Sequence, residues 1–394
     1  METRAVNCEE LGSEGTMFCP QCGQKIGDSV SFCPYCGAPV KRIENGMDAD
    51  AFHIRETAEE GFNRFAEAVS SEIGEKGKAE IHLGDLFSQI LKRHSKEEAE
   101  ELFIYGTPKT TPAPKDIITT WPKPWLYSRV FLYLLLTEIL LWLCVIGFQN
   151  IYSAAGMFFI GAMVVPVSGL IFFWEVNAPR NISIFTAIKI FFAGGAFSFV
   201  STMILYSIAG DFASTNSLIG AMIIGIVEET GKMIISSRYM NKLKEKYILN
   251  GLLIGAAVGA GFAVIETAGY ALDSFMEYWS YGGTLSSSGG FAAHTLFLRS
   301  LLALGGHISW TAVASAGYVA ALDDSKDGGG VLTNRKFYFF FFLVIILHGL
   351  WDGVNVFGYT MPIILTLLIL VVVLILISAG MRQVSRVVEA ETEN

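Results

Sequence analysis

Residues 361–380 read MPIILTLLILVVVLILISAG, a stretch without a single charged side chain. An α-helix needs about 20 apolar residues to cross the hydrocarbon core of a bilayer. Similar stretches precede this one, which agrees with a 52% hydrophobic composition and a mean hydropathy of +0.47. The sequence therefore predicts an all-α polytopic membrane protein with about eight transmembrane helices. We place these spans at residues 126–148, 153–175, 183–209, 216–236, 247–270, 294–321, 336–356 and 361–380.

Charged residues are scarce and unevenly distributed. They make up 16% of the chain, against about a quarter in a typical soluble domain. Most lie in residues 1–124, which predicts a soluble N-terminal third followed by a membrane domain. The net charge of −9 gives no support for a nucleic-acid partner, and we expect none. No apolar core follows the first charged residues, so we expect no cleavable secretory signal.

Basic residues between the spans predict the topology. They occupy alternate loops, and the intervening loops carry no Lys or Arg. Basic loops stay in the cytoplasm, so we expect a multi-pass protein of the cell membrane with both termini cytoplasmic. The basic residues are Arg180, then Arg238, Lys242, Lys244 and Lys246, then Lys326, Arg335 and Lys336, and finally Arg382 and Arg386.

Four of the six cysteines form one compact array. It reads Cys19-Pro-Gln-Cys22-Gly23, then nine residues, then Cys33-Pro-Tyr-Cys36-Gly37. Two such knuckles place four thiolates around a tetrahedral Zn²⁺, and each glycine tolerates the left-handed backbone that follows. So small a domain needs the metal to fold. We predict a structural zinc ribbon over residues 17–40, rather than a redox dithiol pair or unrelated thiols.

The rest of the soluble part is less specific. Residues 48–105 show helical periodicity and predict a cytosolic helical segment, which is either a simple linker or a docking surface. Residues 106–124 form a Pro/Thr-rich linker. The eight-span domain then covers residues 125–381, and residues 382–394 form an acidic cytosolic tail.

Ionisable residues concentrate in spans four to seven. A charged group at mid-bilayer costs at least about 2.5–3.5 kcal/mol, so each needs a partner or a function. The other spans are almost purely apolar, apart from Glu138 and, near the cytoplasmic ends, Arg129 and Lys189. The four motifs read Gly225-Ile-Val-Glu228-Glu229-Thr-Gly-Lys232, Phe262-Ala-Val-Ile-Glu266, Gly306-His307-Ile-Ser-Trp310-Thr311 and His348-Gly-Leu-Trp-Asp352.

The depth of these residues favours a common site. Glu228, His307 and His348 each lie roughly twelve or thirteen residues into their helices, near mid-bilayer, and Glu266 and Asp352 lie nearer the outer side. Helices running in both directions would thus bring carboxylates and imidazoles to neighbouring levels. Polar contacts that only hold helices together would explain one such pair more easily than five groups.

The series EExxK, FxxxE, a histidine in a Gly-His-x-x-x-Thr setting and HxxxD resembles the motifs of the PrsW family of intramembrane proteases. That family is distantly related to the CAAX-protease and bacteriocin-processing superfamily. The resemblance covers residues 216–356, and the motifs match in order on consecutive helices. It implies hydrolysis of peptide bonds in membrane-spanning or membrane-anchored proteins, often a regulator such as an anti-sigma factor. The N-terminal ribbon departs from the simplest members.

A mechanism follows from the chemistry of these groups. A carboxylate in a low-dielectric pocket binds protons more tightly, so Glu228 suits the role of general base toward water. His307 and His348 would hold that water and stabilise the oxyanion, and Asp352 could fix the tautomer of His348. The remaining candidates, Glu229, Lys232 and Glu266, would orient these groups.

Two points stay open in the sequence. Two histidines and a carboxylate could instead hold a catalytic Zn²⁺, which the spacing neither requires nor excludes. The alternative functions are a proton- or ion-coupled transporter and a non-catalytic scaffold that presents the ribbon. The two halves of the membrane domain show no convincing internal repeat, which disfavours a transporter, and the complete motif set disfavours a scaffold.

Overall fold

The computed structural model describes residues 16–19, 21–27, 30, 32–38, 47–243, 247–324, 330–353 and 360–393. The basic residues Lys244, Lys246 and Lys326, the last residues of the span predicted at 336–356, and Asn394 lie outside these ranges. The chain divides into two compact units, Met1–Phe65 and Ala66–Asn394.

The first unit contains the cysteine array. Strands β1 (Thr16–Phe18) and β2 (Lys25–Gly27) pair antiparallel, with Met17 opposite Ile26. Both glycines that follow the knuckles have left-handed backbone, with φ of +70° at Gly23 and +72° at Gly37, as the motif predicts.

The remaining elements are almost all helical. The segment before the membrane domain contains α1 (Met47–Ile73), α2 (Leu83–Phe87), α3 (Lys96–Phe103) and a short turn, η1 (Pro114–Asp116). The membrane domain begins with α4 (Leu126–Ile146), α5 (Tyr152–Val176), α6 (Ile184–Lys189), η2 (Ile190–Gly194), α7 (Gly195–Ala209), η3 (Gly210–Phe212) and α8 (Leu218–Met240). It continues with α9 (Ile248–Ser280), α10 (Leu285–Ala303), η4 (Leu304–Ile308), α11 (Ser309–Asp324), η6 (Val331–Thr333), α12 (Arg335–Asp352) and α14 (Thr360–Glu393).

Helices are found at all eight stretches predicted as spans. Six of them, within the described residues, are long and apolar enough to cross a membrane: Leu126–Ile146, Tyr152–Val176, Ile184–Phe212, Ile248–Ser280, Leu285–Asp324 and Thr360–Glu393. Helices α8 and α12 differ from these because every stretch of 18 residues in either helix contains more than two charged residues. The fold is thus an all-helical multi-pass membrane domain behind a small ribbon, and the count of eight spans stays a prediction.

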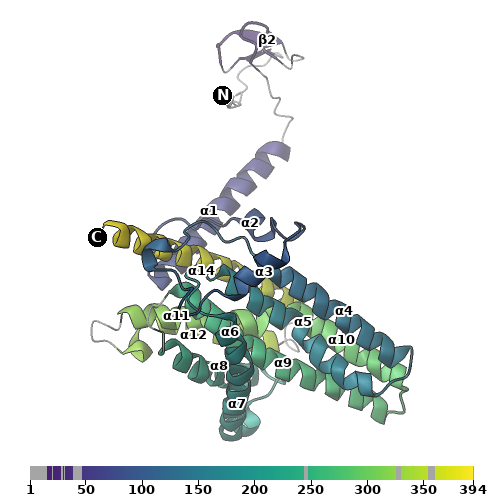
Figure 1. The fold of residues 1–394 in the computed structure, drawn as a ribbon. Helices are drawn as coiled ribbons and strands as arrows, with labels where there is room; N and C mark the ends of the chain where they lie inside the picture. Colours follow the sequence, from purple (N-terminus) through teal and green to yellow (C-terminus); the bar gives the residue numbers. More distant parts are fainter. Residues whose placement is uncertain are drawn as a thin grey trace. The chain divides into compact units, whose positions relative to one another are not determined.

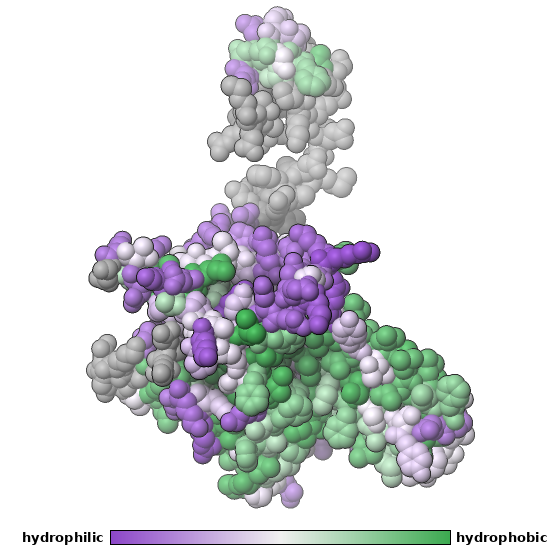
Figure 2. All heavy atoms as spheres, in the orientation of Figure 1, coloured by the Kyte–Doolittle hydropathy of each residue, from purple (hydrophilic) through white to green (hydrophobic). Residues whose placement is uncertain are grey.

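Helix α9 is the centre of the membrane domain. In its most apolar stretch of 18 residues, 94% of the residues are buried. The helix packs against α5, α10 and α11. Helix α4 lies at the edge of the bundle and packs mainly on α5 (Figure 1). Only 6% of the residues in its most apolar stretch of 18 are buried. Figure 2 shows the corresponding surface, with apolar residues over α4 and α10 and hydrophilic ones over α2 and α3.

Residues 66–124, which precede α4, pack against the membrane domain. Among the apolar residues of 83–91, Leu86 is buried, whereas Phe87 and Leu91 are exposed. Ile117 in the Pro/Thr-rich stretch is also buried, and Gly106 lies directly against the backbone of Ile182. These contacts hold residues 66–124 against the helices that follow.

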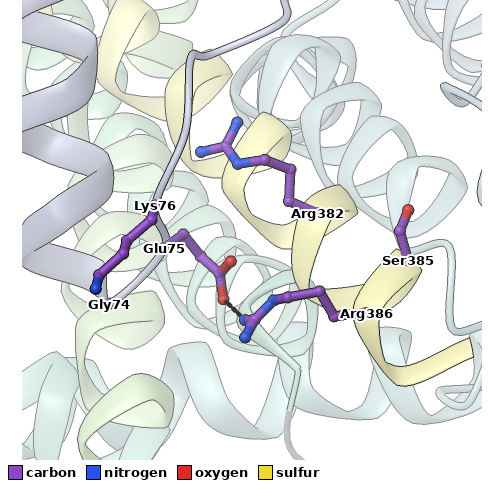
Figure 3. Close-up of a pocket in the computed structure, with 6 residues that line it drawn as sticks. All are labelled: Gly74, Glu75, Lys76, Arg382, Ser385 and Arg386. Atoms are coloured by element: carbon purple, nitrogen blue, oxygen red, sulfur yellow. Dashed lines mark hydrogen bonds and ion pairs between the residues drawn. The ribbon is translucent and has the colours of Figure 1, made fainter. Parts of the chain in front are cut away.

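The C-terminal end of α14 binds the same segment. The Arg382 guanidinium donates to the carbonyl of Lys78 and to the hydroxyls of Ser70 and Ser378. Arg386 forms an ion pair with Glu75, and burial raises the pKa of Glu75 despite this partner. Figure 3 shows the pair at the edge of a cavity of about 580 Å³, which is lined by Gly74, Glu75, Lys76, Arg382, Ser385 and Arg386. None of the predicted site residues lines this cavity.

Candidate active site and zinc ribbon

The structure brings together all seven residues that the sequence singled out in the membrane domain. Helix α8 carries Glu228, Glu229 and Lys232, α9 carries Glu266, η4 carries His307, and α12 carries His348 and Asp352. Four of them are buried, with exposed fractions of 6% for Glu228, 0% for Glu229 and Lys232, and 1% for His348. The other three are less deeply covered.

Two glycines allow the backbones that carry the histidines to come close. A Cβ at Gly259 of α9 would collide with the carbonyl of His307. On α8, a Cβ at Gly225 would lie 2.9 Å from the carbonyl of Ile345 and 3.4 Å from Cβ of His348. Small residues at such positions are how membrane helices reach close contact.

A break in the helix presents His307. Gly306 has φ −105° and ψ −131°, which is not helical, and the turn around it is wide, as in a π-helix. Breaks of this kind are frequent at functional sites. Gly306 therefore separates α10 from α11 and places the imidazole of His307 beside α8.

Lys232 is at the centre of the ion pairs. Its Nζ donates to Glu229 Oε1 at 2.8 Å and to Glu228 Oε2 at 3.2 Å. The same nitrogen lies 2.8 Å from Nδ1 of His307 and 4.2 Å from the ring centre of Phe262. The two glutamates diverge by about 100° around the helix, which predicts different surroundings. The long lysine side chain nevertheless contacts both.

The hydrogen bonds of His307 define its tautomer. An ammonium group can only donate, so Nδ1 of His307 accepts from Lys232 and the ring proton is on Nε2. That Nε2 lies 2.8 Å from Glu266 Oε2, to which it donates. Glu266 also accepts from Arg299 Nη2 at 2.7 Å. His307 is therefore held from both sides.

His348 is held in the same manner by carboxylates. Its Nδ1 lies 2.8 Å from Glu229 Oε1, and its Nε2 lies 3.3 Å from Asp352 Oδ2. The indole of Trp310 stacks on the ring at 4.4 Å between centres and an angle of 27°. The same Nε2 also lies 3.7 Å from Oε2 of Glu228.

Glu228 occupies the convergence point of these groups. Its Oε2 lies 3.7 Å from His348 Nε2 and 3.8 Å from His307 Nδ1, and its Oε1 accepts a hydrogen bond of 2.9 Å from the Tyr206 hydroxyl. The two imidazole distances exceed a hydrogen bond but are short enough for one water oxygen to contact both partners. The site thus combines a buried carboxylate with two imidazoles and the Lys232 ammonium.

The sequence did not identify three residues that contact these groups. Tyr206 lies in a span predicted to be almost purely apolar, and its signal was a phenol that needs a hydrogen-bond partner when buried. Arg299 was visible as a charge within a span, but its partner Glu266 is on another helix. Trp310 belongs to the quoted motif, yet its contact with His348 depends on how α11 packs.

The donor set also suits a metal ion in its chemistry. One donor atom each from Glu228, His307 and His348 lies within 4.8 Å of the other two. Two histidines and a carboxylate are the ligands of many hydrolytic zinc sites. Here, however, the Lys232 ammonium contacts His307 Nδ1 and Glu228 Oε2, which are two of the three donor atoms. A divalent ion does not fit these donors while the ammonium group is in this position.

The cysteine array forms a separate metal site. Donor atoms of Cys19, Cys22, Cys33 and Cys36 all lie within 4.8 Å of one another. The sulfur distances are 3.6 Å for Cys19–Cys36 and 3.7 Å for Cys22–Cys33, far longer than a disulfide bond. Burial raises the pKa of Cys19, but backbone hydrogen bonds at Cys22 and Gln21 outweigh it and lower the pKa to about 7. Four cysteines at these distances form the closed ligand set of a structural zinc site.

Comparison with known proteins agrees with both sites. A family model described as PrsW family intramembrane metalloprotease matches residues 182–379, just over half of the chain and all seven site residues of the membrane domain. A zinc-ribbon domain model matches residues 18–40. Neither a curated protein nor a solved structure matched the chain. The chain therefore belongs to the PrsW family of intramembrane proteases and carries a zinc ribbon at its N-terminal end.

Proposed function

We propose that this protein hydrolyses a peptide bond in a membrane-spanning or membrane-anchored protein, and that Glu228 is the general base. The observation that carries the proposal is the convergence of His307 and His348 on Oε2 of Glu228, at 3.8 and 3.7 Å. Membership of a protease family makes the transporter and scaffold alternatives less favourable, and no contact in the described residues favours either.

The proposed reaction needs only groups of this chain and water. Glu228 removes a proton from water, and the resulting hydroxide attacks the carbonyl carbon of the scissile bond. The protonated Glu228 then gives its proton to the amide nitrogen as the C–N bond breaks, which leaves a carboxylic acid and an amine. General acid–base catalysis of this kind contributes about 10²- to 10⁴-fold to the rate.

We assign the two histidines different roles: His348 stabilises the developing oxyanion, and His307 helps to position the water. His348 is suited to its role because Glu229 holds its Nδ1, while its Nε2 lies 3.3 Å from Asp352 Oδ2 and 3.7 Å from Glu228 Oε2. His307 is fixed between Lys232 and Glu266 and forms the opposite wall. Groups held in place before the reaction stabilise charge without reorganisation during it.

We propose further that the reaction proceeds without a catalytic metal. The family is described as one of metalloproteases, which implies a catalytic metal ion. Here, however, the Lys232 ammonium contacts two of the three donor atoms that would bind such an ion. A buried lysine beside two carboxylates already supplies the positive charge that such an ion would bring. In this proposal the charge of Lys232 balances those of Glu228 and Glu229.

The substrate would be a protein held in the membrane, for example a regulator such as an anti-sigma factor. The reaction would take place within the lipid bilayer. We propose a cell-membrane location with both termini in the cytoplasm, on the same side as the ribbon. This orientation is supported by the alternation of basic loops along the sequence.

The test is a cleavage assay with single-span membrane proteins co-expressed with the full-length chain. The wild type should release a shortened product, and Glu228→Gln, which keeps the shape of the side chain but cannot accept the proton, should not. Glu277→Gln is the matched control, since Glu277 is exposed at the far end of α9. Full cleavage by Glu228→Gln would contradict the proposal.

A further inference from the structure

A pocket separate from the ionisable cluster lies between α4, α5 and α10. Its volume is about 290 Å³, and nearly all the side chains that line it are apolar. Phe131, Leu135 and Ile139 contribute from successive turns of α4, and Leu296 and Ser300 from α10. Residues 131 to 142 of a helix extend over roughly 16 Å, so the pocket follows the helix axes through the middle of the predicted span.

Two polar side chains on α4 face this apolar pocket. Glu138 and Trp142 are one helical turn apart, and both line it. The carboxylate atom Oε2 of Glu138 and the indole Nε1 of Trp142 are both buried, and neither has a hydrogen-bond partner within the described part of the chain. A carboxyl group deep in a membrane helix is costly, and buried polar groups normally have partners.

The surrounding residues make room for the carboxyl group. A Cβ at Gly161 of α5 would lie 2.9 Å from Cδ and Oε1 of Glu138 and 2.8 Å from Cδ1 of Leu296. A larger residue at 161 would therefore force the carboxyl group of Glu138 or the side chain of Leu296 to shift. The carbonyl of Gly161 accepts from Ser300 at 3.0 Å, which joins α5 to α10 at the same level.

The pocket is next to the catalytic cluster. Helix α10 carries Ser300 on the pocket side, and the preceding residue, Arg299, donates to Glu266. Glu266 in turn holds His307. A molecule bound in the pocket would therefore lie against the helix that positions one of the two active-site histidines.

The exposed apolar border of the pocket and its two polar groups indicate what kind of molecule would bind there. The pocket is bordered by side chains on the outer surface of the bundle, with exposed fractions of 42% for Ile139, 64% for Phe297 and 60% for Leu301. A lipid chain could fill the apolar part but has no polar group at this depth to pair with Glu138 and Trp142. A transmembrane helix with an amide or hydroxyl side chain near its middle can offer both a donor and an acceptor.

We propose that this pocket binds the transmembrane helix of the protease's substrate, and that Glu138 and Trp142 select a helix with an amide or hydroxyl side chain near its midpoint. The role as a substrate site rests on the proposed proteolytic function. The binding itself does not, and it can be measured without cleavage.

The experiment uses full-length protein in phosphatidylcholine nanodiscs, with Glu228→Gln introduced to prevent cleavage. The probe is a leucine-rich single-span peptide with one central Asn and a photocrosslinker beside it, and the matched peptide has Leu in place of Asn. The Asn peptide should bind about 5- to 30-fold more tightly, which is the effect of one interhelical hydrogen bond in model helices. Crosslinks should map to α4 and α10.

Matched variants assign the preference to the pocket. Glu138→Leu and Trp142→Phe should each reduce the preference for Asn, and Gly161→Leu should block the pocket and weaken binding. Thr137→Val should change nothing, because the Thr137 hydroxyl already donates to the carbonyl of Tyr133 on its own helix. Correct folding of each variant is checked by its thermal unfolding midpoint.

Three results would overturn the proposal. They are equal binding of the Asn and Leu peptides, an Asn preference that survives Glu138→Leu, and labelling of the pocket by a photoactivatable lipid that the Asn peptide does not displace. Failure of the catalytic proposal looks different. In that case the Asn preference would persist, while the protein with Glu228 intact cleaves no single-span substrate.

Discussion

The Nζ of Lys232 lies 2.8 Å from Nδ1 of His307 and links α8 to the helix break that precedes α11. The same nitrogen contacts both neighbouring glutamates, so one fully buried cation connects the proposed base to both imidazoles, to His307 directly and to His348 through Glu229. This arrangement explains how the four buried groups, Glu228, Glu229, Lys232 and His348, tolerate burial. It also determines which nitrogen of His307 carries the proton.

The first prediction concerns this cation. Lys232→Met should abolish cleavage and markedly lower the thermal unfolding midpoint, because loss of one partner from a buried ion pair costs about 3–5 kcal/mol. Lys189→Met is the control, since Lys189 is exposed on α6. Thermal unfolding of the purified proteins in detergent measures the difference. Equal midpoints for the two variants would show that Lys232 does not balance the glutamates.

The second prediction ranks the proposed catalytic residues. Replacement of Glu228, His307 or His348 by Ala should lower the cleavage rate by about two to four orders of magnitude. Asp352→Asn should be milder, because the amide oxygen can still accept a hydrogen bond from His348. Glu229→Ala and Glu266→Ala should be severe in part through lost folding, so their unfolding midpoints must be compared. Normal cleavage by His307→Ala/His348→Ala would reject the assignment.

The third prediction tests Tyr206, whose hydroxyl donates to Oε1 of Glu228. Hydrogen bonds to charged groups are worth about 1.5–3 kcal/mol, so Tyr206→Phe should lower kcat by roughly 10- to 100-fold. KM should stay nearly unchanged, because the ring remains. Tyr133→Phe removes an exposed hydroxyl on α4 and should leave kcat unaltered. A change confined to KM would mean that Tyr206 contacts the substrate and does not position the base.

The fourth prediction counts zinc. The purified wild type should contain one Zn²⁺ per chain, Cys22→Ser/Cys33→Ser should contain none, and Cys144→Ser should still contain one. Elemental analysis after extensive dialysis at neutral pH under reducing conditions gives these numbers. Two ions in the wild type, with one left in the double variant, would place the second ion in the membrane site and contradict the metal-free mechanism.

The fifth prediction is topological. Reporter fusions after Arg238, Ser325 and Asn394 should report the cytoplasm, and fusions near Asp211 and Ser287 should report the outside. Because the ionisable residues lie from mid-bilayer outward in this topology, cleavage should occur in the outer half of the substrate span or just beyond it. A cytoplasmic signal at Ser287, or a product terminus on the cytoplasmic side, would reverse this arrangement.

Much of the site was predictable because its motifs are local. The spacing of His348 and Asp352, or of Glu228 and Lys232, is a property of one helix, and helix periodicity alone places such pairs on one face. The cysteine knuckles are local in the same sense, since each sets two thiolates and one left-handed glycine within five residues. For these features the pattern of residue types was sufficient.

Contacts between helices could not be predicted in this manner. Arg299 with Glu266, Trp310 with His348, and Tyr206 with Glu228 each join residues on different elements. They depend on close helix approach at glycines such as Gly225 and Gly259, and on the break at Gly306. Many glycines occur in these spans, and a single sequence does not indicate which ones lie at a helix crossing.

The sequence by itself determined the membrane architecture, the zinc ribbon and the identity of the seven candidate residues, because hydropathy and motif spacing act over short distances along the chain. Only the tertiary structure decided which atoms meet. It placed the ammonium group of Lys232 against Glu228 and His307, two residues of the candidate metal site. Within the described residues it also left Oε2 of Glu138 and Nε1 of Trp142 without hydrogen-bond partners beside an apolar pocket. The physical reason is that burial and pairing of charges depend on distances in space, and helices far apart in the sequence set those distances.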